Sequence, residues 1–289
     1  MNVLVVSGIW PPDVGGPASH APELAAFLHE RGHGVRVLVT ASAPPEPRPY
    51  PVDHVSRRLP AGARHVAVAA AVARRARRAD VVYATSMLGR SALGAAAARR
   101  PLVVKLTGDE AYERARRRGL FAGDLEEFQR GGGGPVAAAL RRARDLALAQ
   151  ARHVFVPSAF LREVALGWGL PPERVSVLPN AAPDTSALPA REELRRGLGL
   201  EDATLALAFA GRLTEAKALD VALAALAEVE DVSLLVVGDG PDRAGLEALA
   251  ARLGLAGRVR FLGPLPRERV LEVFHAADGS LLSSRWENF

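Results

Sequence analysis

The sequence predicts an α/β protein of two domains, each with a parallel β-sheet covered by helices on both faces. Short apolar runs rich in Val and Leu alternate with longer alanine-rich segments of helical periodicity along the 289 residues. This is the pattern of strands that are buried on both sides of a parallel sheet. The alternation stops at a Pro- and Ala-rich stretch, residues 179–189, and then starts again. The length also fits two domains.

Residues 1–185 are assigned to the first domain. Four consecutive glycines, residues 131–134, interrupt the helical pattern without ending the alternation, so we interpret them as a loop inside this domain. The expected strands are 2–7, 35–40, 80–84, 102–106, 153–157 and 175–178, and the expected helices include 19–31, 64–78, 136–152 and 159–167.

Residues 190–289 repeat the pattern and are assigned to a second domain. Because the strand expected at 278–283 should be followed by another helix, we expect this domain to be incomplete. Both domains are predicted to be doubly wound and Rossmann-like. The expected strands are 204–210, 232–237, 259–262 and 278–283, and the expected helices are 218–228, 242–253 and 267–276.

The composition excludes several kinds of chemistry and of targeting segment. The chain has no cysteine, which excludes disulfides, cysteine-ligated metal sites and thiol chemistry. Its N-terminus lacks the basic region of a signal peptide, and no apolar run is long enough to cross a bilayer. We therefore expect a soluble, cytoplasmic protein.

The positive charge is concentrated in the first half of the chain. Residues 1–189 carry 25 Lys and Arg against 16 Asp and Glu, whereas residues 190–289 carry 12 against 16. No aromatic residues interleave the arginine clusters, which argues against nucleic acid as a partner. The clusters fit solvated helix faces, and they also fit peripheral contact with anionic lipid at the inner face of a membrane.

A glycine-rich loop follows the first expected strand. In the sequence Pro-Pro-Asp-Val-Gly-Gly, residues 11–16, Gly15 and Gly16 precede a helix whose first amides can bind an anion. The two glycines are adjacent and no third follows, so this is not a dinucleotide-binding fingerprint. An ordinary βα turn is the competing interpretation.

Two cations lie on one βα loop of the second domain. Arg212 follows the expected strand 204–210, and Lys217 precedes the next helix. Together they can bind a diphosphate, the guanidinium as a planar fork and the ammonium as a point charge. Of the 37 basic residues, 35 are arginine, so a lysine kept at this position suggests a specific need for it.

Two further loops of the second domain give weaker signals. The Gly-Asp-Gly-Pro sequence beginning at Gly238 can bring backbone close to a nucleotide, although a plain turn explains it equally well. Glu287 follows the last expected strand at its carboxyl end, where open α/β sheets bind ligands. A surface glutamate is the competing interpretation.

In order along the chain, these pieces resemble the retaining GT-B glycosyltransferases of family 4, the glycosyl transferases group 1. The resemblance covers essentially the whole chain. The motifs are Pro-Pro with Gly-Gly at 11–16, Arg-Gly-His-Gly-Val at 31–35, Val-Pro-Ser at 156–158, Val-Leu-Pro-Asn at 177–180, Ala-Gly-Arg at 210–212 with Lys217, Gly-Asp-Gly-Pro at 238–241, Phe-Leu-Gly at 261–263, and Ser-Ser at 283–284 with Glu287.

The resemblance implies a GT-B-like fold and a role for each motif. The glycine loop would lie near the diphosphate and the acceptor, the two cations would bind the diphosphate, and the glutamate would contact the transferred sugar. It assigns donor binding to Gly15, Gly16, Arg212, Lys217, Gly238, Gly263, Pro264, Leu265 and Glu287, and catalysis to Asp109 and Glu287.

The chain departs from the family pattern at three places. The glutamate that usually follows Glu287 by eight positions has no counterpart, so we expect a chain ending here to bind diphosphate without transferring sugar. Gly108-Asp109 stands where many members have His-Asp, and Asn180-Ala181 where Asn-Gly is usual. These two changes bear on how Asp109 acts and on the turn after Asn180.

The predicted function is transfer of a sugar from a nucleoside diphosphate sugar to a glycan or lipid-linked acceptor, with retention of configuration. Neither Asp-x-Asp nor a metal-ligand spacing of histidines occurs, so no metal and no cofactor are expected. A nucleotide-sugar epimerase of the same fold and a non-catalytic nucleotide-sugar-binding fragment are the alternatives. A nicotinamide-dependent dehydrogenase lacks its three-glycine fingerprint here.

Overall fold

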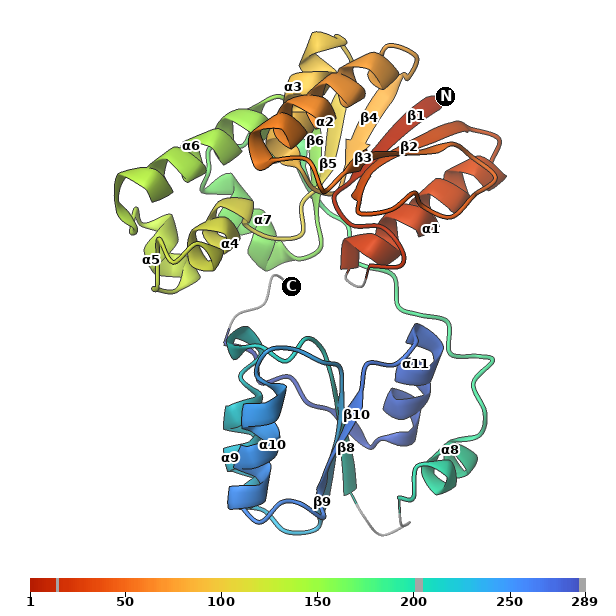
Figure 1. Ribbon diagram of the computed structural model, residues 1–289, viewed down its shortest axis with the longest axis vertical. Coiled ribbons are helices and arrows are strands. Elements are labelled where there is room, and N and C mark those ends of the chain that lie inside the picture. Colours follow the sequence, from red (N-terminus) through yellow and green to blue (C-terminus); the bar gives the residue numbers. More distant parts are fainter. Residues whose placement is uncertain (14–15, 201–204, 286–289) are drawn as a thin grey trace. The chain divides into compact units, whose positions relative to one another are not determined.

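The computed structural model describes residues 1–13, 16–200 and 205–285, without the side chains of 16–18. The chain forms two compact units, Met1–Asn180 and a second that begins at Ala181, each with its own parallel sheet (Figure 1). The domain limits assigned from the sequence, residues 1–185 and 190–289, stay a prediction. Among the described residues, no helix combines the length and apolar character needed to cross a membrane.

In the part of the chain that the structure describes, the sheet of the first unit has seven parallel strands in the order β3-β2-β1-β4-β5-β6-β7. The order reverses between β1 and β4, which makes this unit doubly wound as predicted. The strands are β1 (Asn2–Ser7), β2 (Gly34–Ala41), β3 (Val52–Ser56), β4 (Val81–Ala84), β5 (Leu102–Lys105), β6 (Ala151–Val156) and β7 (Val175–Val177).

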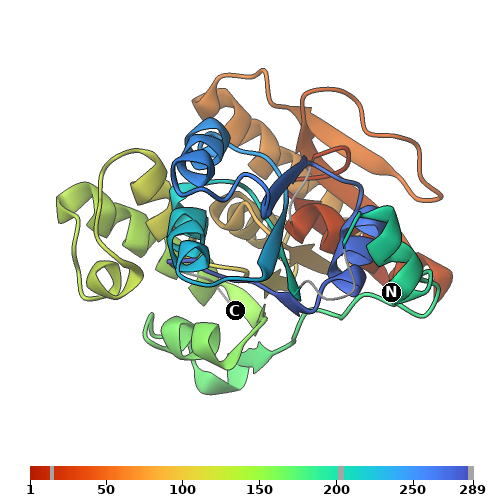
Figure 2. The same cartoon turned by 90° about the horizontal axis from the view of Figure 1, so that it is seen from below.

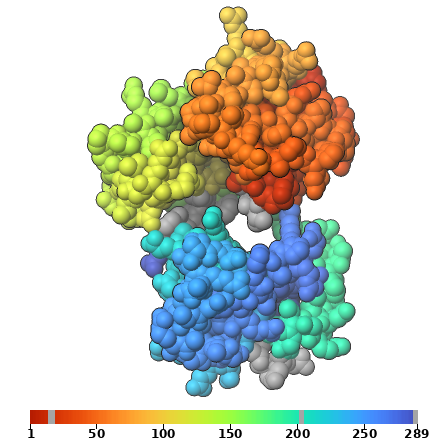
Figure 3. All heavy atoms as spheres, viewed as in Figure 1, coloured from red at the N-terminus to blue at the C-terminus, as the bar shows by residue number. Residues whose placement is uncertain are grey.

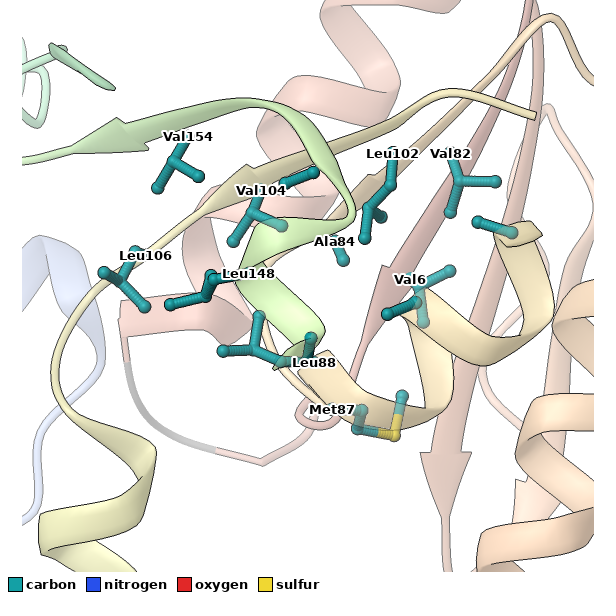
Figure 4. Close-up of a cluster of buried hydrophobic side chains, with 14 of the residues drawn as sticks. Val6, Val82, Ala84, Met87, Leu88, Leu102, Val104, Leu106, Leu148 and Val154 are labelled. Atoms are coloured by element: carbon teal, nitrogen blue, oxygen red, sulfur yellow. The ribbon is translucent and has the colours of Figure 1, made fainter. Parts of the chain in front are cut away.

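Helices cover both faces of this sheet, because alternate strand residues point to opposite sides. Val3 and Val5 of β1 pack with α1, whereas Leu4 and Val6 belong to the larger core on the other face, under α2, α3 and α6 (Figure 4). The helices are α1 (Gly16–Glu30), α2 (Ala61–Ala76), α3 (Leu88–Ala97), α4 (Glu110–Arg117), α5 (Leu125–Gln129), α6 (Gly134–Ala149) and α7 (Ala159–Leu166), with a 3-10 turn η1 (Pro172–Arg174).

The second unit has a smaller parallel sheet of four described strands in the order β10-β9-β8-β11. Helices α9 and α10 lie on one side of it, and α11 and α8 lie on the other (Figures 1 and 2). The elements are α8 (Arg191–Gly197), β8 (Leu205–Ala210), η2 (Glu215–Lys217), α9 (Leu219–Ala227), β9 (Val232–Val237), α10 (Arg243–Arg252), β10 (Val259–Gly263), α11 (Arg267–Ala276) and β11 (Gly279–Ser280).

The structure adds elements that were not predicted. Strand β3 lies at a sheet edge and carries Asp53 and His54, so it lacks the continuous apolar run expected of a strand. Helix α8 lies just after the Pro- and Ala-rich stretch. Strand β11 is also shorter than the expected 278–283, with only two residues paired to β8. Helices α3, α4 and α5 are further additions.

Asp278 connects α8, α11 and β8, and it offers a test of this packing by pH. Its carboxylate accepts the Ala206 amide at 2.8 Å and an Arg195 N–H at 3.2 Å, and it also pairs with Arg191. The Ala206 amide above all, with the arginines, lowers the pKa of Asp278 to about 2 from its ordinary 3.8. An acidic group with a lowered pKa stabilises the fold above its unfolded pKa, and this stabilisation is lost as the pH falls through the folded pKa.

Asp278→Asn should therefore destabilise the protein by about 1 kcal/mol at pH 7, after allowance for solvent screening. Between pH 4 and pH 2 the difference from the wild type should disappear. Urea denaturation of both proteins at pH 7, 4 and 2.5 measures it. A difference that stays constant over this range would show that the carboxylate charge is not what stabilises the junction.

Candidate functional site

The carboxyl ends of the four described strands of the second unit lie at one edge of its sheet, since the strands are parallel. The strand order reverses between β8 and β11, and α/β sheets bind ligands at such a point, beyond the carboxyl ends of the strands. The segments at this edge are the loop 211–218 after β8, the loop 238–242 after β9, residues 264–266 after β10, and residues 281–285 after β11.

The β8–α9 loop, residues 211–218, carries both predicted diphosphate-binding cations. Arg212 is exposed, and in the described part of the chain no carboxylate lies within ion-pair distance of its guanidinium. Lys217 is half-buried and lies over Gly211: a Cβ built on Gly211 would be 3.8 Å from the Lys217 Cε. The Lys217 side chain thus lies beside the residue that precedes Arg212 in the chain.

Residues after β11 hydrogen-bond to this loop. The Ser283 hydroxyl donates to the Lys217 carbonyl at 2.9 Å, and the Arg285 amide donates to the Ala216 carbonyl at 2.9 Å. The Arg285 guanidinium also pairs with Asp220 at 3.2 Å. The segment that leads to Glu287 is therefore attached to the loop that carries the cations. Glu287 itself lies outside the described residues.

Gly238 packs against the β8–α9 loop from the neighbouring strand. A Cβ on Gly238 would lie 1.9 Å from the Gly211 carbonyl oxygen, and its φ is +127°. Gly240 approaches the loop in the same way, because its Cβ would lie 2.1 Å from the Leu213 carbonyl oxygen. The two glycines allow one loop to pack on the other, which fixes the backbone on both sides of Arg212. Whether Gly238 also contacts a donor stays a prediction.

Gly238→Ala should displace the β8–α9 loop, since the new methyl group cannot coexist with the Gly211 carbonyl. Together with the unfavourable backbone angle, we expect a loss of about 1–3 kcal/mol in stability and a weaker nucleoside diphosphate complex. Thermal unfolding and calorimetric titration measure the two effects. Gly245→Ala is the matched control, because nothing lies within 4 Å of its Cβ position and alanine favours the helix. Equal effects of both substitutions would contradict the proposed packing role.

Gly263, Pro264 and Leu265, which were predicted to bind the donor, lie at the last residue of β10 and directly after it. The Gly263 carbonyl accepts the Gly238 amide at 2.8 Å, which joins this loop to the Gly238 loop. Pro264 is exposed, and Leu265 packs against the core on the α11 face. Gly211, Gly238 and Gly263 therefore form one continuous backbone cluster, with Arg212 and Lys217 on its first loop.

In the first unit, the base of the glycine loop is held by charged groups. Arg57 contacts both Asp13 carboxylate oxygens, at 2.5 and 3.1 Å, and it donates to the Gly8 carbonyl at 2.9 Å. The hydrogen bond from Arg57 lowers the pKa of Asp13. Gly15 lies outside the described residues, and Gly16 is the first residue of α1. Their contact with a donor stays a prediction.

Asp109, predicted to be catalytic, is the centre of a buried network. Its Oδ1 accepts the amides of Ala111 and Tyr112 at 2.8 and 3.2 Å and so caps α4. Its Oδ2 accepts the Gln129 side chain at 2.8 Å and the Arg144 guanidinium at 2.5 Å. Only 1% of the Asp109 surface is exposed. These contacts favour a positioning role, and a catalytic role stays a prediction.

Trp168 closes this network. Its indole N–H donates to the Gln129 side-chain oxygen at 2.7 Å, and its ring lies 3.8 Å from the centre of the Arg144 guanidinium. Asp109, Gln129, Arg144 and Trp168 thus form a ring of contacts, which we call the Asp109 network. It joins the start of α4, the end of α5, the middle of α6 and the turn after α7.

The sequence-based prediction missed Lys105 at the end of β5. Its side chain is 2% exposed, and its ammonium donates to the Leu178 carbonyl. Burial lowers the pKa of Lys105. Nearby, His20 hydrogen-bonds to the Tyr83 hydroxyl at 2.9 Å. Burial is the main cause that lowers the pKa of His20, and the charge of Lys105 is the second. The scarcity of lysine, which drew attention to Lys217, applied equally to Lys105.

No group of three or more His, Asp or Glu side chains is placed to ligate a metal ion within the described residues. The expectation of a metal-free site stays a prediction. Charge neutralisation by the protein at the second sheet would come from Arg212, Lys217 and the helix amides.

Two parallel-sheet α/β units, the second smaller and with a cationic loop at its reversal point, define a protein of the GT-B type. Residues 15–181 match the glycosyl transferase 4-like domain, and residues 190–289 match the glycosyl transferases group 1. The chain therefore belongs to the glycosyl transferase 4-like family. The resemblance inferred from the motifs is confirmed.

Curated relatives match over part of their length. A D-inositol 3-phosphate glycosyltransferase from Mycobacterium sp. (strain KMS) is 39% identical over 125 residues, which are 41% of this chain and 28% of the relative. A 2-deoxystreptamine glucosyltransferase from Streptomyces kanamyceticus is 36% identical over 154 residues, 50% of this chain and 38% of the relative. The matched segments thus span well under half of these relatives.

Solved structures agree on the fold. Anabaena Alr3699/HepE, in complex with UDP and glucose, matches with a TM-score of 0.73 at 21% identity, covering 100% of this chain and 76% of the other. Sucrose-phosphate synthase from Thermosynechococcus elongatus matches with a TM-score of 0.76 at 16% identity, covering 100% and 77%. At these identities the matches establish the GT-B fold.

Proposed function

We propose that this protein transfers a sugar from a nucleoside diphosphate sugar to an acceptor hydroxyl, with retention of configuration. The observation that carries the proposal is the β8–α9 loop, which presents Arg212 and Lys217 at the reversal point of the second sheet. Such a point is where a doubly wound sheet binds a nucleotide. The family to which the chain belongs supports the same reaction class.

The chemistry needs a stabilised leaving group more than it needs a protein nucleophile. When the sugar–phosphate bond breaks, negative charge grows on the diphosphate and positive character on the sugar carbon. Two cations held at the diphosphate stabilise that charge. Preorganised donors of this kind lower the free energy of the transition state by on the order of several kcal/mol. With the acceptor attacking from the face of the leaving group, a diphosphate oxygen takes the acceptor proton. No triad or pair of carboxylates is then required.

The remaining site residues complete this proposal. Glu287 would accept hydrogen bonds from the transferred sugar, and the segment 283–285 would set its position through the β8–α9 loop. Gly15 and Gly16 would lie by the diphosphate and the acceptor, and residues 263–265 by the base. Since Alr3699/HepE was solved with UDP and glucose, we place UDP-glucose first among the donors to test. The acceptor would be a glycan or a lipid-linked molecule.

A nucleotide panel tests the proposal. UDP, GDP, ADP and TDP, followed by their sugars, should each be added in thermal unfolding experiments, because a ligand that binds only the folded state raises its stability. At a hundred times the dissociation constant, the matching nucleotide should stabilise the protein by about 2.7 kcal/mol. A transfer assay with the matching donor and NMR of the product then give the anomeric configuration. If no nucleoside diphosphate raises the melting temperature, the proposed site is wrong.

A further inference from the structure

The first unit contains a pocket that the proposed donor chemistry does not use. It has a volume of about 580 Å³ and lies between α2, α3, α4 and α6. Ligand-binding pockets in proteins have volumes of about 300–1,000 Å³, so this one can hold a small molecule. In Figure 3, α2 in orange lies next to α4 and α6 in yellow to green on the surface of this unit.

The lining of the pocket is polar at one end and apolar at the other. His65, Arg90, Glu110 and Arg114 lie in the first two turns of α2, α3 and α4, which begin at the carboxyl edge of the sheet. Further along α2 and α3 the lining includes Ala73, Leu93 and Ala97, and α6 contributes Leu140, Ala143 and Arg144. From His65 to Ala73 the pocket extends about 12 Å along α2, from the helical rise per residue.

The polar end carries an excess of positive charge. Burial lowers the pKa of His65, and Arg90, Arg114, Arg64 and Arg118 lower it further. Burial also lowers the pKa of Arg90, with a further contribution from Arg114. The guanidinium groups of Arg90 and Arg114 therefore repel one another, and an anion placed between them would relieve the repulsion.

Glu110 is the one acid among the described residues of the lining, and the protein already provides its partners. Burial raises the pKa of Glu110, while Arg114 and the backbone amides of Leu88 and Met87 oppose that shift. One carboxylate against the guanidinium groups of Arg90 and Arg114 leaves the polar end positive. The side chains of Ala73, Leu93 and Ala97 offer no hydrogen-bonding groups of the kind that a sugar or a peptide backbone needs when it is buried.

We propose that this pocket binds a phosphate-bearing lipid, with the hydrocarbon chain between α2 and α3 and the phosphate against Arg90 and Arg114. An apolar pocket with a cationic mouth is complementary to such an amphiphile in both shape and charge. A role of this lipid as the sugar acceptor would rest on the proposed function. Binding of the lipid itself is independent of any sugar nucleotide.

Calorimetric titration of the full chain with octyl and decyl phosphate, below their micelle concentrations, tests the proposal. Decyl phosphate should bind about fifteenfold more tightly than octyl phosphate, because it buries two more methylenes and each contributes about fourfold in affinity. Decyl maltoside and inorganic phosphate should each bind at least about tenfold more weakly than decyl phosphate, since each lacks one half of the recognition. Equal affinity for decyl phosphate and decyl maltoside, or no binding of either, would overturn the proposal.

Matched variants locate the site. Arg90→Gln and Leu93→Asp should each weaken decyl phosphate binding by about tenfold or more. Arg142→Gln and Leu146→Asp change exposed residues of α6 outside the pocket and should leave the affinity unchanged. Leu93 and Leu146 are comparably exposed, at 62% and 56%, so both variants should fold, which circular dichroism checks. If Leu146→Asp weakens binding as much as Leu93→Asp, the lipid adsorbs to the surface and the pocket is not its site.

The titrations contain no nucleotide, so they separate this proposal from the donor proposal. If the lipid binds and no nucleotide stabilises the protein, the pocket proposal is supported and the donor-site proposal is wrong. If a nucleotide stabilises the protein and no lipid binds, the pocket proposal is wrong and the donor-site proposal is supported.

Discussion

Arg212→Ala and Lys217→Ala should each weaken binding of the matching nucleoside diphosphate by about ten- to a hundredfold. Each variant removes one cation from the β8–α9 loop, and hydrogen bonds to charged groups contribute about 1.5–3 kcal/mol. Binding of the corresponding nucleoside, which has no phosphate, should change by less than about threefold. Calorimetric titration with both ligands measures the difference directly.

Two further variants separate local contact from general charge. Arg196→Ala removes the same charge from an exposed position on α8, away from the loop, and should leave diphosphate binding nearly unchanged. Arg212→Lys keeps the charge but loses the planar fork, so it should restore only part of the affinity. If the nucleoside and the diphosphate lose affinity equally in Arg212→Ala, the residue supports the fold of the loop and does not contact phosphate.

The parts of the fold that follow from local periodicity were predicted well. In β1, Val3 and Val5 face one core while Leu4 and Val6 face the other, and such double burial is visible in the sequence as a continuous apolar run. Helix α3 was missed because it contains glycines. Gly94 is required there by tertiary packing: a Cβ would lie 2.5 Å from the Val72 Cβ of α2. A one-dimensional pattern does not show that approach.

In the candidate site too, local features could be predicted from the sequence and contacts between distant segments could not. Arg212 and Lys217 lie within six residues of one another, so their convergence was visible in the sequence. The packing of Gly238 on the Gly211 carbonyl depends on the neighbouring strand, so the Gly-x-Gly motif alone did not reveal it. The contacts of Asp109 could not be predicted from the sequence, because Arg144 follows it by 35 residues and Trp168 comes later still.

Arg144→Met should be the most destabilising substitution considered, at about 3–5 kcal/mol. It removes the cation from a fully buried ion pair and leaves the Asp109 carboxylate, 1% exposed, without its charged partner. The stacking of Arg144 on Trp168 is lost as well. Globular proteins are stable by about 5–15 kcal/mol, so this variant loses a large part of that margin. Urea denaturation at neutral pH measures it, with Arg142→Met, at an exposed position of the same helix, as control.

The double variant Asp109→Asn/Arg144→Met decides between a structural and a catalytic Asp109. An Asn oxygen can still accept the Ala111 and Tyr112 amides that cap α4, and it leaves no buried charge. The double variant should therefore lose less stability than the sum of the two single variants, by about 1–3 kcal/mol. If the folded double variant transfers sugar at a rate close to that of the wild type, Asp109 acts only by positioning α4, α5 and α6. Near-complete loss of transfer, with unchanged diphosphate affinity and an intact fold, would instead place its carboxylate among the catalytic groups.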